Sequence, residues 1–275
     1  MTAPVLSARS RFAALVRLPD ASFDLAEAAL LVAAEEYPQL PTAAYLRRLD
    51  LLAERVKDRL ADESAPLLVL QELSRLLFES EGLRGNVAAY YDPRNSFLND
   101  VLDRRLGIPL TLSIVYLEVG WRLGLPLEGV NFPGHFLVRY RGEALDALVD
   151  PFQQGQIRFA DDMQELLDRL YGGSVKLQPD FLRPAGKRDM LVRLLANLKS
   201  IYFNTRDDAR ALAAIERILL VRPDEPDELR DRGMLLARAG RAAEALSDLE
   251  RYLDCAPEAP DAARVQMLID QLQNG

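Results

Sequence analysis

The chain has 275 residues, of which 49% are hydrophobic and 28% charged, so its composition excludes a disordered polymer and supports one large or two ordinary folded domains. It carries 34 Lys and Arg against 42 Asp and Glu, a formal net charge of −8. An acidic chain without a run of basic residues longer than a pair repels phosphate backbones, so we expect no nucleic-acid partner.

Targeting signals and membrane segments are absent from the sequence pattern. The stretch Met1 to Asp20 has no uninterrupted apolar region followed by a cleavage site. Every apolar run is broken by charge before the roughly 18 residues that a membrane span needs. The single cysteine excludes an intrachain disulfide and fits a reducing compartment. We therefore expect a soluble cytoplasmic protein without a membrane partner.

The first hundred residues have the apolar periodicity of helices. Asp24 is a capping residue for a helix over Leu25–Glu36, which stops before a proline. Leucines and valines recur at helical spacing from Leu46 to Leu60. Pro66 opens a third helical run that ends at Glu81-Gly82. These amphipathic faces predict packing into one helical core.

A polar segment and a second proline-led helix follow. Asn95 or Ser96 is a suitable N-cap for a short helix through Leu106, with Gly107 at its C-terminal end. Pro109 then suits the first turn of a buried helix that runs to Leu123.

Beyond this helix the periodicity changes to that of strands. The segments 127–132, 135–140 and 144–149 are short and rich in β-forming residues, and the turn residues 141–143 separate the last two. A helix over about 161–171 follows. The segment 177–188 contains two prolines and predicts a linker.

The last third contains an internal repeat with a period of 34 residues. A shift by that period superimposes similar residues, among them Ala211 on Ala245, Ile215 on Leu249 and Pro223 on Pro257. This pattern resembles the tetratricopeptide repeat, in which helix pairs stack and bury one another's faces. We expect Gly233 and Ala245 at close helix crossings. Cys255 aligns with Val221, so we expect a small buried side chain without thiol reactivity.

The one histidine of the chain provides the clearest chemical signal. His135 enters one apolar strand in Pro133-Gly134-His135-Phe136, and Asp150 leaves the next in Val149-Asp150-Pro151. An aspartate beside a histidine orients the imidazole, so the two make up the base and the orienting group of a nucleophile–base–orienter site. Cys255 lies more than a hundred residues further on, in the repeat, and is not a candidate nucleophile.

Several motifs agree in order with one bacterial family. They are Tyr91-Asp92-Pro93-Arg94-Asn95-Ser96, Gly107-Ile108-Pro109-Leu110-Thr111-Leu112-Ser113, Pro133-Gly134-His135-Phe136 and Asp150-Pro151-Phe152. With the repeat, they resemble the SirB-type family, which joins a transglutaminase-like domain to C-terminal tetratricopeptide repeats. The resemblance covers nearly the whole chain. It implies an α+β fold: a mostly helical N-terminal region with a small antiparallel, papain-like sheet, followed by α-helical repeats. We expect domains at 1–176 and 189–275.

The wider transglutaminase-like superfamily implies a cysteine at a helix N-terminus, followed by His and Asp on successive strands. His135 and Asp150 match the base and the orienter. The cysteine position falls near Pro109 or Leu110, which have no nucleophilic atom. Thr111 and Ser113 are the nearest hydroxyls, and either would need a base in contact and an oxyanion hole.

Two functions follow from this pattern. The first is a pseudoenzyme, a non-catalytic protein that acts in protein–protein interaction or regulation and binds a protein or peptide in its degenerate cleft and repeat groove. The second is a hydrolase or acyltransferase that uses Thr111 or Ser113 with His135 and Asp150. A hydroxyl within about 3.2 Å of an imidazole nitrogen would favour the second function. Neither requires a cofactor, and the pattern leaves the oligomeric state open.

The candidate binding residues are Tyr91, Asn95, Asn99, His135 and Asp150. Each has a simpler interpretation: His135 and Asp150 as a structural pair, and the other three as groups that hold their loop together by capping and hydrogen bonds. One His and one Asp are too few ligands for a metal site.

Overall fold

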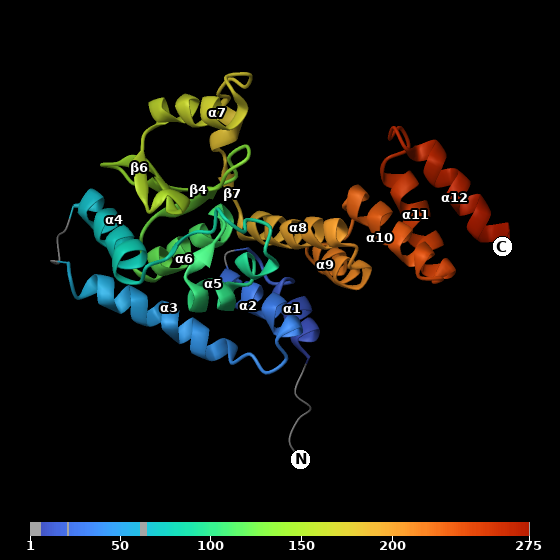
Figure 1. Cartoon of the computed structure of the whole chain (residues 1–275), viewed down its shortest axis with the longest axis horizontal. Coiled ribbons are helices and arrows are strands. Elements are labelled where there is room, and N and C mark those ends of the chain that lie inside the picture. The colour runs from blue at the N-terminus through green and yellow to red at the C-terminus, as the bar shows by residue number, and fades with distance from the viewer. Residues whose placement is uncertain (1–6, 21, 61–64, 275) are drawn as a thin grey trace, which may run out of the picture. The chain divides into compact units, whose positions relative to one another are not determined.

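The computed structural model describes residues 7–20, 22–60 and 65–274. The first six residues of the stretch searched for a targeting signal therefore lie outside the described residues. By contact density the chain divides into two compact units, unit 1 up to Leu194 and unit 2 from Leu195. Unit 1 begins with helices (Figure 1), whose bounds are α1 Ala8–Leu15, α2 Leu25–Glu36, α3 Thr42–Lys57, α4 Pro66–Ser74, α5 Leu98–Arg104 and α6 Pro109–Arg122.

Helix α2 has the bounds that the sequence predicts. The Asp24 side chain accepts a hydrogen bond from the backbone N–H of Glu27 at 2.9 Å, which satisfies a donor that the first turn leaves free. Helix α6 begins at Pro109, as expected, and is buried along nearly its whole length. Because α2, α3, α4 and α5 all pack against α6, it forms the centre of unit 1.

The third predicted run continues beyond α4 in a wider coil. Residues 75–80 form one turn of π-helix, in which the N–H of Glu81 reaches back to the carbonyl of Leu76. The run ends at Glu81, and Gly82 follows with a positive φ of 74°.

The short helix α5 is confirmed, but its predicted ends are wrong. Its N-cap is Phe97 instead of Asn95 or Ser96, because residues 93–95 form a separate 3-10 turn. The helix stops at Arg104, since Arg105 adopts a left-handed conformation with φ of 61°. Gly107 belongs to strand β2 (Leu106–Gly107), which pairs in parallel with β1 (Arg84–Gly85). Sequence patterns gave no signal for this two-residue pairing.

A five-stranded antiparallel sheet follows α6, with the strand order β6-β5-β4-β3-β7. The strand bounds are β3 Leu127–Val130, β4 Leu137–Arg141, β5 Asp146–Asp150, β6 Gln156–Arg158 and β7 Pro184–Ala185. Helix α7 (Met163–Tyr171) packs its buried face on this sheet through Met163, Leu166 and Leu167. Helices at one end of the unit and an antiparallel sheet give the α+β class that the sequence predicts.

The segment 177–188, for which the sequence predicts a linker, contains β7. Strand β7 pairs with β3 through Gly129↔Ala185 and Val130↔Pro184, so this segment adds an edge to the sheet. Helix α8 (Lys187–Thr205) then runs through the division between the two units at Leu194 and Leu195. The domain bounds 1–176 and 189–275 stay a prediction.

Unit 2 consists of the rest of α8 and four further helices, α9 Asp208–Val221, α10 Pro226–Arg238, α11 Ala242–Cys255 and α12 Ala262–Asn274. The close crossing predicted at Gly233 is confirmed: a Cβ there would stand 2.7 Å from the Leu249 side chain and 3.3 Å from the Ala245 carbonyl. The prediction that Cys255 is buried is wrong, because its side chain is exposed. Val221, at the matching position, is buried and is followed by the three helices α10, α11 and α12, whereas α12 alone follows Cys255. Among the described residues, none of the helices has the length and apolar character to cross a membrane.

Candidate functional site

His135 and Asp150 lie side by side where β4 begins and β5 ends. The hydrogen bond predicted between them is confirmed. Strands β4 and β5 are antiparallel, with Val138 opposite Val149, so the start of β4 lies beside the end of β5. The Nε2 atom of His135 is 2.9 Å from Oδ1 of Asp150. His135 precedes β4 instead of entering it, because Gly134 has a positive φ and the His135 N–H closes a turn onto the Phe132 carbonyl.

Asp150 orients the imidazole as well as the chain that follows it. The Asp150 carboxylate accepts a hydrogen bond from Nε2 of His135, which fixes the orientation of the imidazole ring. The same Oδ1 accepts the N–H of Gln153 at 3.2 Å and caps the 3-10 turn over residues 151–153. Asp150 is fully buried and His135 is 6% exposed, so bulk water does not compete for this contact.

A third buried group, Arg158, faces the other oxygen of Asp150. Its Nε lies 3.8 Å from Oδ2 of Asp150, and neither atom has a hydrogen-bond partner. Arg158 comes from β6, which pairs with β5. No sequence pattern indicates Arg158, because a three-residue strand is too short for a periodic signal. We call His135, Asp150 and Arg158 the His135 cluster.

Thr111, next to the expected nucleophile position, uses its hydroxyl both as a donor and as an acceptor of hydrogen bonds. Its hydroxyl donates to the carbonyl of Asn95 at 2.7 Å and accepts the N–H of Ile108 at 3.1 Å. Thr111 therefore joins the start of α6 to the polar segment before α5. A hydroxyl whose proton is committed to a carbonyl is not activated by a base.

The Asn95 side chain makes three hydrogen bonds to the segment that precedes it. Its Oδ1 accepts a hydrogen bond from Nδ2 of Asn86 at 2.9 Å, and its own Nδ2 donates to the carbonyls of Ala89 and Tyr90 at 2.7 and 3.1 Å. Asn95 has no exposed surface. We call Asn86, Asn95 and Thr111 the loop cluster, because they hold the segment 86–111 together by hydrogen bonds.

The position that would hold a cysteine has no nucleophile. Pro109 and Leu110 are both buried at the start of α6. Ser113 is also buried, and its Oγ has no hydrogen-bond partner. In the part of the chain that the structure describes, the His135 side chain forms its one hydrogen bond with Asp150 and none with a hydroxyl.

The remaining candidates lie at different depths. Asn99 is buried in α5, and its Oδ1 is unpaired. Tyr91 is 74% exposed.

A series of edge-to-face ring contacts leads from Tyr91 to His135. The distances between ring centres are 5.3 Å from Tyr91 to Tyr90, 6.4 Å from Tyr90 to Phe152 and 6.0 Å from Phe152 to His135. Burial raises the pKa of Tyr90, so its phenol stays a proton donor at neutral pH.

Within the described ranges, no three or more His, Cys, Asp or Glu side chains come together in a way that could hold a metal ion. The site is thus a buried histidine with its carboxylate and guanidinium, bordered by aromatic rings.

Two profiles of known domains divide the chain. Residues 43–196 match the transglutaminase-like superfamily, and residues 198–270 match the tetratricopeptide repeat. The first match covers both the loop cluster and the His135 cluster.

Relatives from several bacteria are similar over most of the chain. A UPF0162 protein of Xylella fastidiosa is 38% identical over 263 residues, which is 94% of each chain. A UPF0162 protein of Pseudomonas aeruginosa is 35% identical over 93% of this chain and 87% of its own. Protein SirB1 of Salmonella typhimurium is 29% identical over 84% of this chain and 90% of its own. The chain belongs to the SirB-type family of transglutaminase-like proteins with tetratricopeptide repeats. No solved structure gives a significant match.

Proposed function

We propose that the chain is a non-catalytic cytoplasmic protein that acts in protein–protein interaction or regulation, and that its repeat unit binds a peptide segment of a partner protein. The observation that carries this proposal is an open groove between α10 and α12. Helical repeats bind peptides in such grooves, where apolar side chains supply affinity and charged ones supply specificity.

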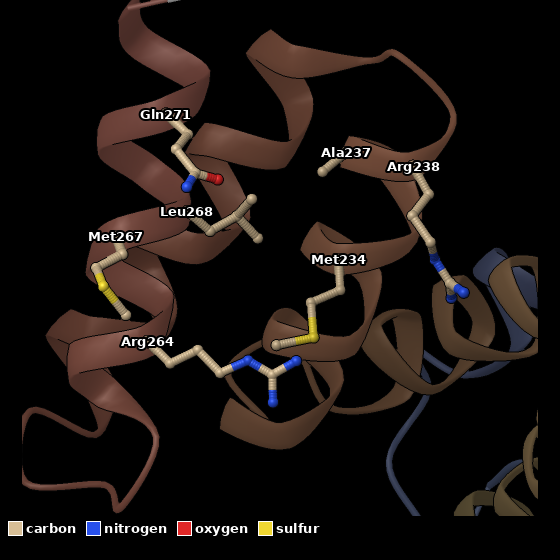
Figure 2. Close-up of a pocket in the computed structure, with 7 residues that line it drawn as sticks. All are labelled: Met234, Ala237, Arg238, Arg264, Met267, Leu268 and Gln271. Atoms are coloured by element: carbon tan, nitrogen blue, oxygen red, sulfur yellow. The ribbon is translucent and has the colours of Figure 1, made fainter.

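The groove has a volume of about 530 Å³ and is lined by residues from both helices. Figure 2 shows Met234 on one side and Leu268 on the other, with both side chains pointing into the space between the helices. The full set is Met234, Ala237, Arg238, Arg264, Met267, Leu268 and Gln271. Methionine side chains adapt to differently shaped apolar partners, which suits a peptide-binding surface.

Two arginines define the charge of the partner. Arg264 and Arg238 border the groove in a chain that is acidic as a whole. Arg264 has no ion-pair partner among the described residues, and Arg238 makes one exposed pair with Asp208 at 3.5 Å. The partner segment therefore combines an apolar side chain with at least one carboxylate.

The lack of an activated nucleophile supports the non-catalytic part of the proposal. Pro109 and Leu110 stand where the superfamily has a cysteine, Thr111 donates its hydroxyl proton to the Asn95 carbonyl, and the Ser113 hydroxyl has no hydrogen-bond partner among the described residues. An acyl-transfer reaction needs a nucleophile in contact with its base.

The groove is tested by an acidic substitution in the full chain. Met267 is 58% exposed, so Met267→Glu should leave the fold intact while placing a negative charge against an acidic partner. Leu51→Glu is the matched control, because Leu51 is 56% exposed on α3 in unit 1. Affinity capture from native lysate should yield a protein retained by wild type and by Leu51→Glu but depleted at least about tenfold by Met267→Glu. A synthetic peptide from that protein should then bind the purified wild-type chain.

Equal capture by both variants would contradict binding in the groove. The non-catalytic part fails separately if the purified chain hydrolyses an ester or amide and Ser113→Ala or Thr111→Val abolishes that hydrolysis.

A further inference from the structure

Gly134, His135 and Phe136 directly precede β4, and each is covered by a group from another element. The hydroxyl of Tyr171, the last residue of α7, would be 2.9 Å from a Cβ on Gly134. The Phe152 ring meets His135 edge-on at 6.0 Å. The guanidinium of Arg193 lies 5.4 Å from the centre of the Phe136 ring. Tyr171, Phe152 and Arg193 therefore surround the turn that presents His135.

Arg193 has no carboxylate partner among the described residues. It is half-buried in α8, and among the described residues its one close partner is the face of Phe136. Burial lowers the pKa of its guanidinium, and the proximity of the phenols of Tyr90 and Tyr171 offsets part of that effect. Arg139, by contrast, pairs with both oxygens of Asp146 at 2.7 and 2.6 Å.

The two phenols beside Arg193 are free to donate. Neither the Tyr90 nor the Tyr171 hydroxyl has a hydrogen bond within the described part of the chain, and both side chains are partly open to solvent, 38% and 39% exposed. Phe136 covers one face of the Arg193 guanidinium, and stacking of this kind leaves the N–H groups at its edge available. A guanidinium and the two phenols that interact with it electrostatically therefore lie around the turn that presents His135, and neither phenol has an acceptor among the described residues.

We propose that Arg193, Tyr90 and Tyr171 bind the carboxylate of an organic acid or of a peptide C-terminus, next to His135. A guanidinium matches a carboxylate with two parallel hydrogen bonds. The site supplies one positive charge, which balances a monoanion, whereas a phosphate dianion would leave excess negative charge in a partly buried site of an acidic protein. The group attached to the carboxylate would lie against Phe152 and the His135 ring. This site is in unit 1, distinct from the groove between α10 and α12.

The single histidine makes the test direct. The imidazole Hε1 resonance of the full chain can be followed by proton NMR at constant pH, and no other histidine contributes to it. Sodium hexanoate should shift this resonance in a saturable manner, and hexanamide, which lacks the charge, should not. Inorganic phosphate should bind at least about tenfold more weakly than hexanoate.

Single variants distinguish binding at this site from a nonspecific effect of the charge of the protein. Arg193→Gln should weaken hexanoate binding by about tenfold or more, and Tyr171→Phe and Tyr90→Phe each by a few-fold. Arg183→Gln is the matched control, because Arg183 is exposed and removal of its charge should change nothing.

If Arg193→Gln does not fold, the two phenol variants carry the test. Absence of a saturable shift, an equal effect of Arg183→Gln, or unchanged affinity in the phenol variants would overturn the proposal. Tighter binding of phosphate than of hexanoate would overturn the assignment to a carboxylate.

Discussion

The loop cluster and the His135 cluster are both buried in unit 1, but they differ in how many of their polar atoms have hydrogen-bond partners. In the loop cluster, Asn95 and Thr111 each use their side-chain donors and acceptors in hydrogen bonds of 2.7–3.1 Å. In the His135 cluster, Oδ2 of Asp150 and Nε of Arg158 lie 3.8 Å apart without a hydrogen bond. The first cluster fixes the backbone, and the second leaves two buried polar atoms without hydrogen bonds.

This difference has a consequence for stability. A saturated network cannot lose one member without leaving another buried group unpaired. Asp150 is under the same constraint, because its carboxylate faces the buried guanidinium of Arg158.

The largest effect should come from the charge in the His135 cluster. Asp150→Asn keeps an acceptor for His135 but leaves the buried Arg158 without a counter-charge, which should lower the free energy of unfolding by about 3–5 kcal/mol. Urea denaturation measures this loss. The double variant with Arg158→Gln should recover part of it. A loss below about 1 kcal/mol would mean that Arg158 is not held by Asp150.

Thr111→Val should break the loop cluster at nearly constant side-chain volume. The Asn95 carbonyl and the Ile108 N–H would both lose a buried partner, at a cost of roughly 2 kcal/mol in the free energy of unfolding. Thr205→Val is the control, because Thr205 is exposed and water can replace its hydroxyl. Equal effects at the two positions would remove the distinction between a saturated buried network and a surface hydroxyl.

Ser113→Ala should have a smaller effect of opposite sign. The Ser113 hydroxyl is buried without a partner, so its removal should leave stability unchanged or raise it by up to about 1 kcal/mol in urea denaturation. A clear loss of stability would reveal a hydrogen bond to this hydroxyl and would return Ser113 to the list of functional groups.

The smallest effect concerns pH. Arg94, and with it Arg104, lowers the pKa of Asp92 below its ordinary value of 3.8. A depressed folded-state pKa contributes stability above the unfolded value, and this contribution is lost as pH falls through the folded value. The melting temperature of Asp92→Asn should therefore be lower than that of wild type at neutral pH and converge with it in acid. A constant difference across this range would contradict the prediction.

Local signals predicted the helices better than the sheet and the site. The Asp24 cap and the proline at position 109 act within one helical turn, so α2 and α6 begin where the sequence predicts. Strands β1, β2 and β7 have two residues each, and pairing with distant segments alone defines them.

The same physical reason limits the prediction of the site. The order of the motifs places His135 beside Asp150, and the contact is confirmed. Arg158 on β6 faces Asp150 and Arg193 on α8 faces Phe136, and in the sequence each is an ordinary arginine among many. Their importance depends on burial and on missing partners, which only tertiary packing determines.

The exposure of Cys255 has a practical consequence for spectroscopy. Cys255 is the one thiol of the chain and lies in unit 2, and Trp121 is the one indole and lies in unit 1. A dye attached to Cys255 can therefore accept excitation energy from Trp121 in the native sequence, without any added or deleted residue. The efficiency of that transfer reports the separation of the two units directly, and a change on addition of hexanoate or of a partner peptide would reveal communication between them.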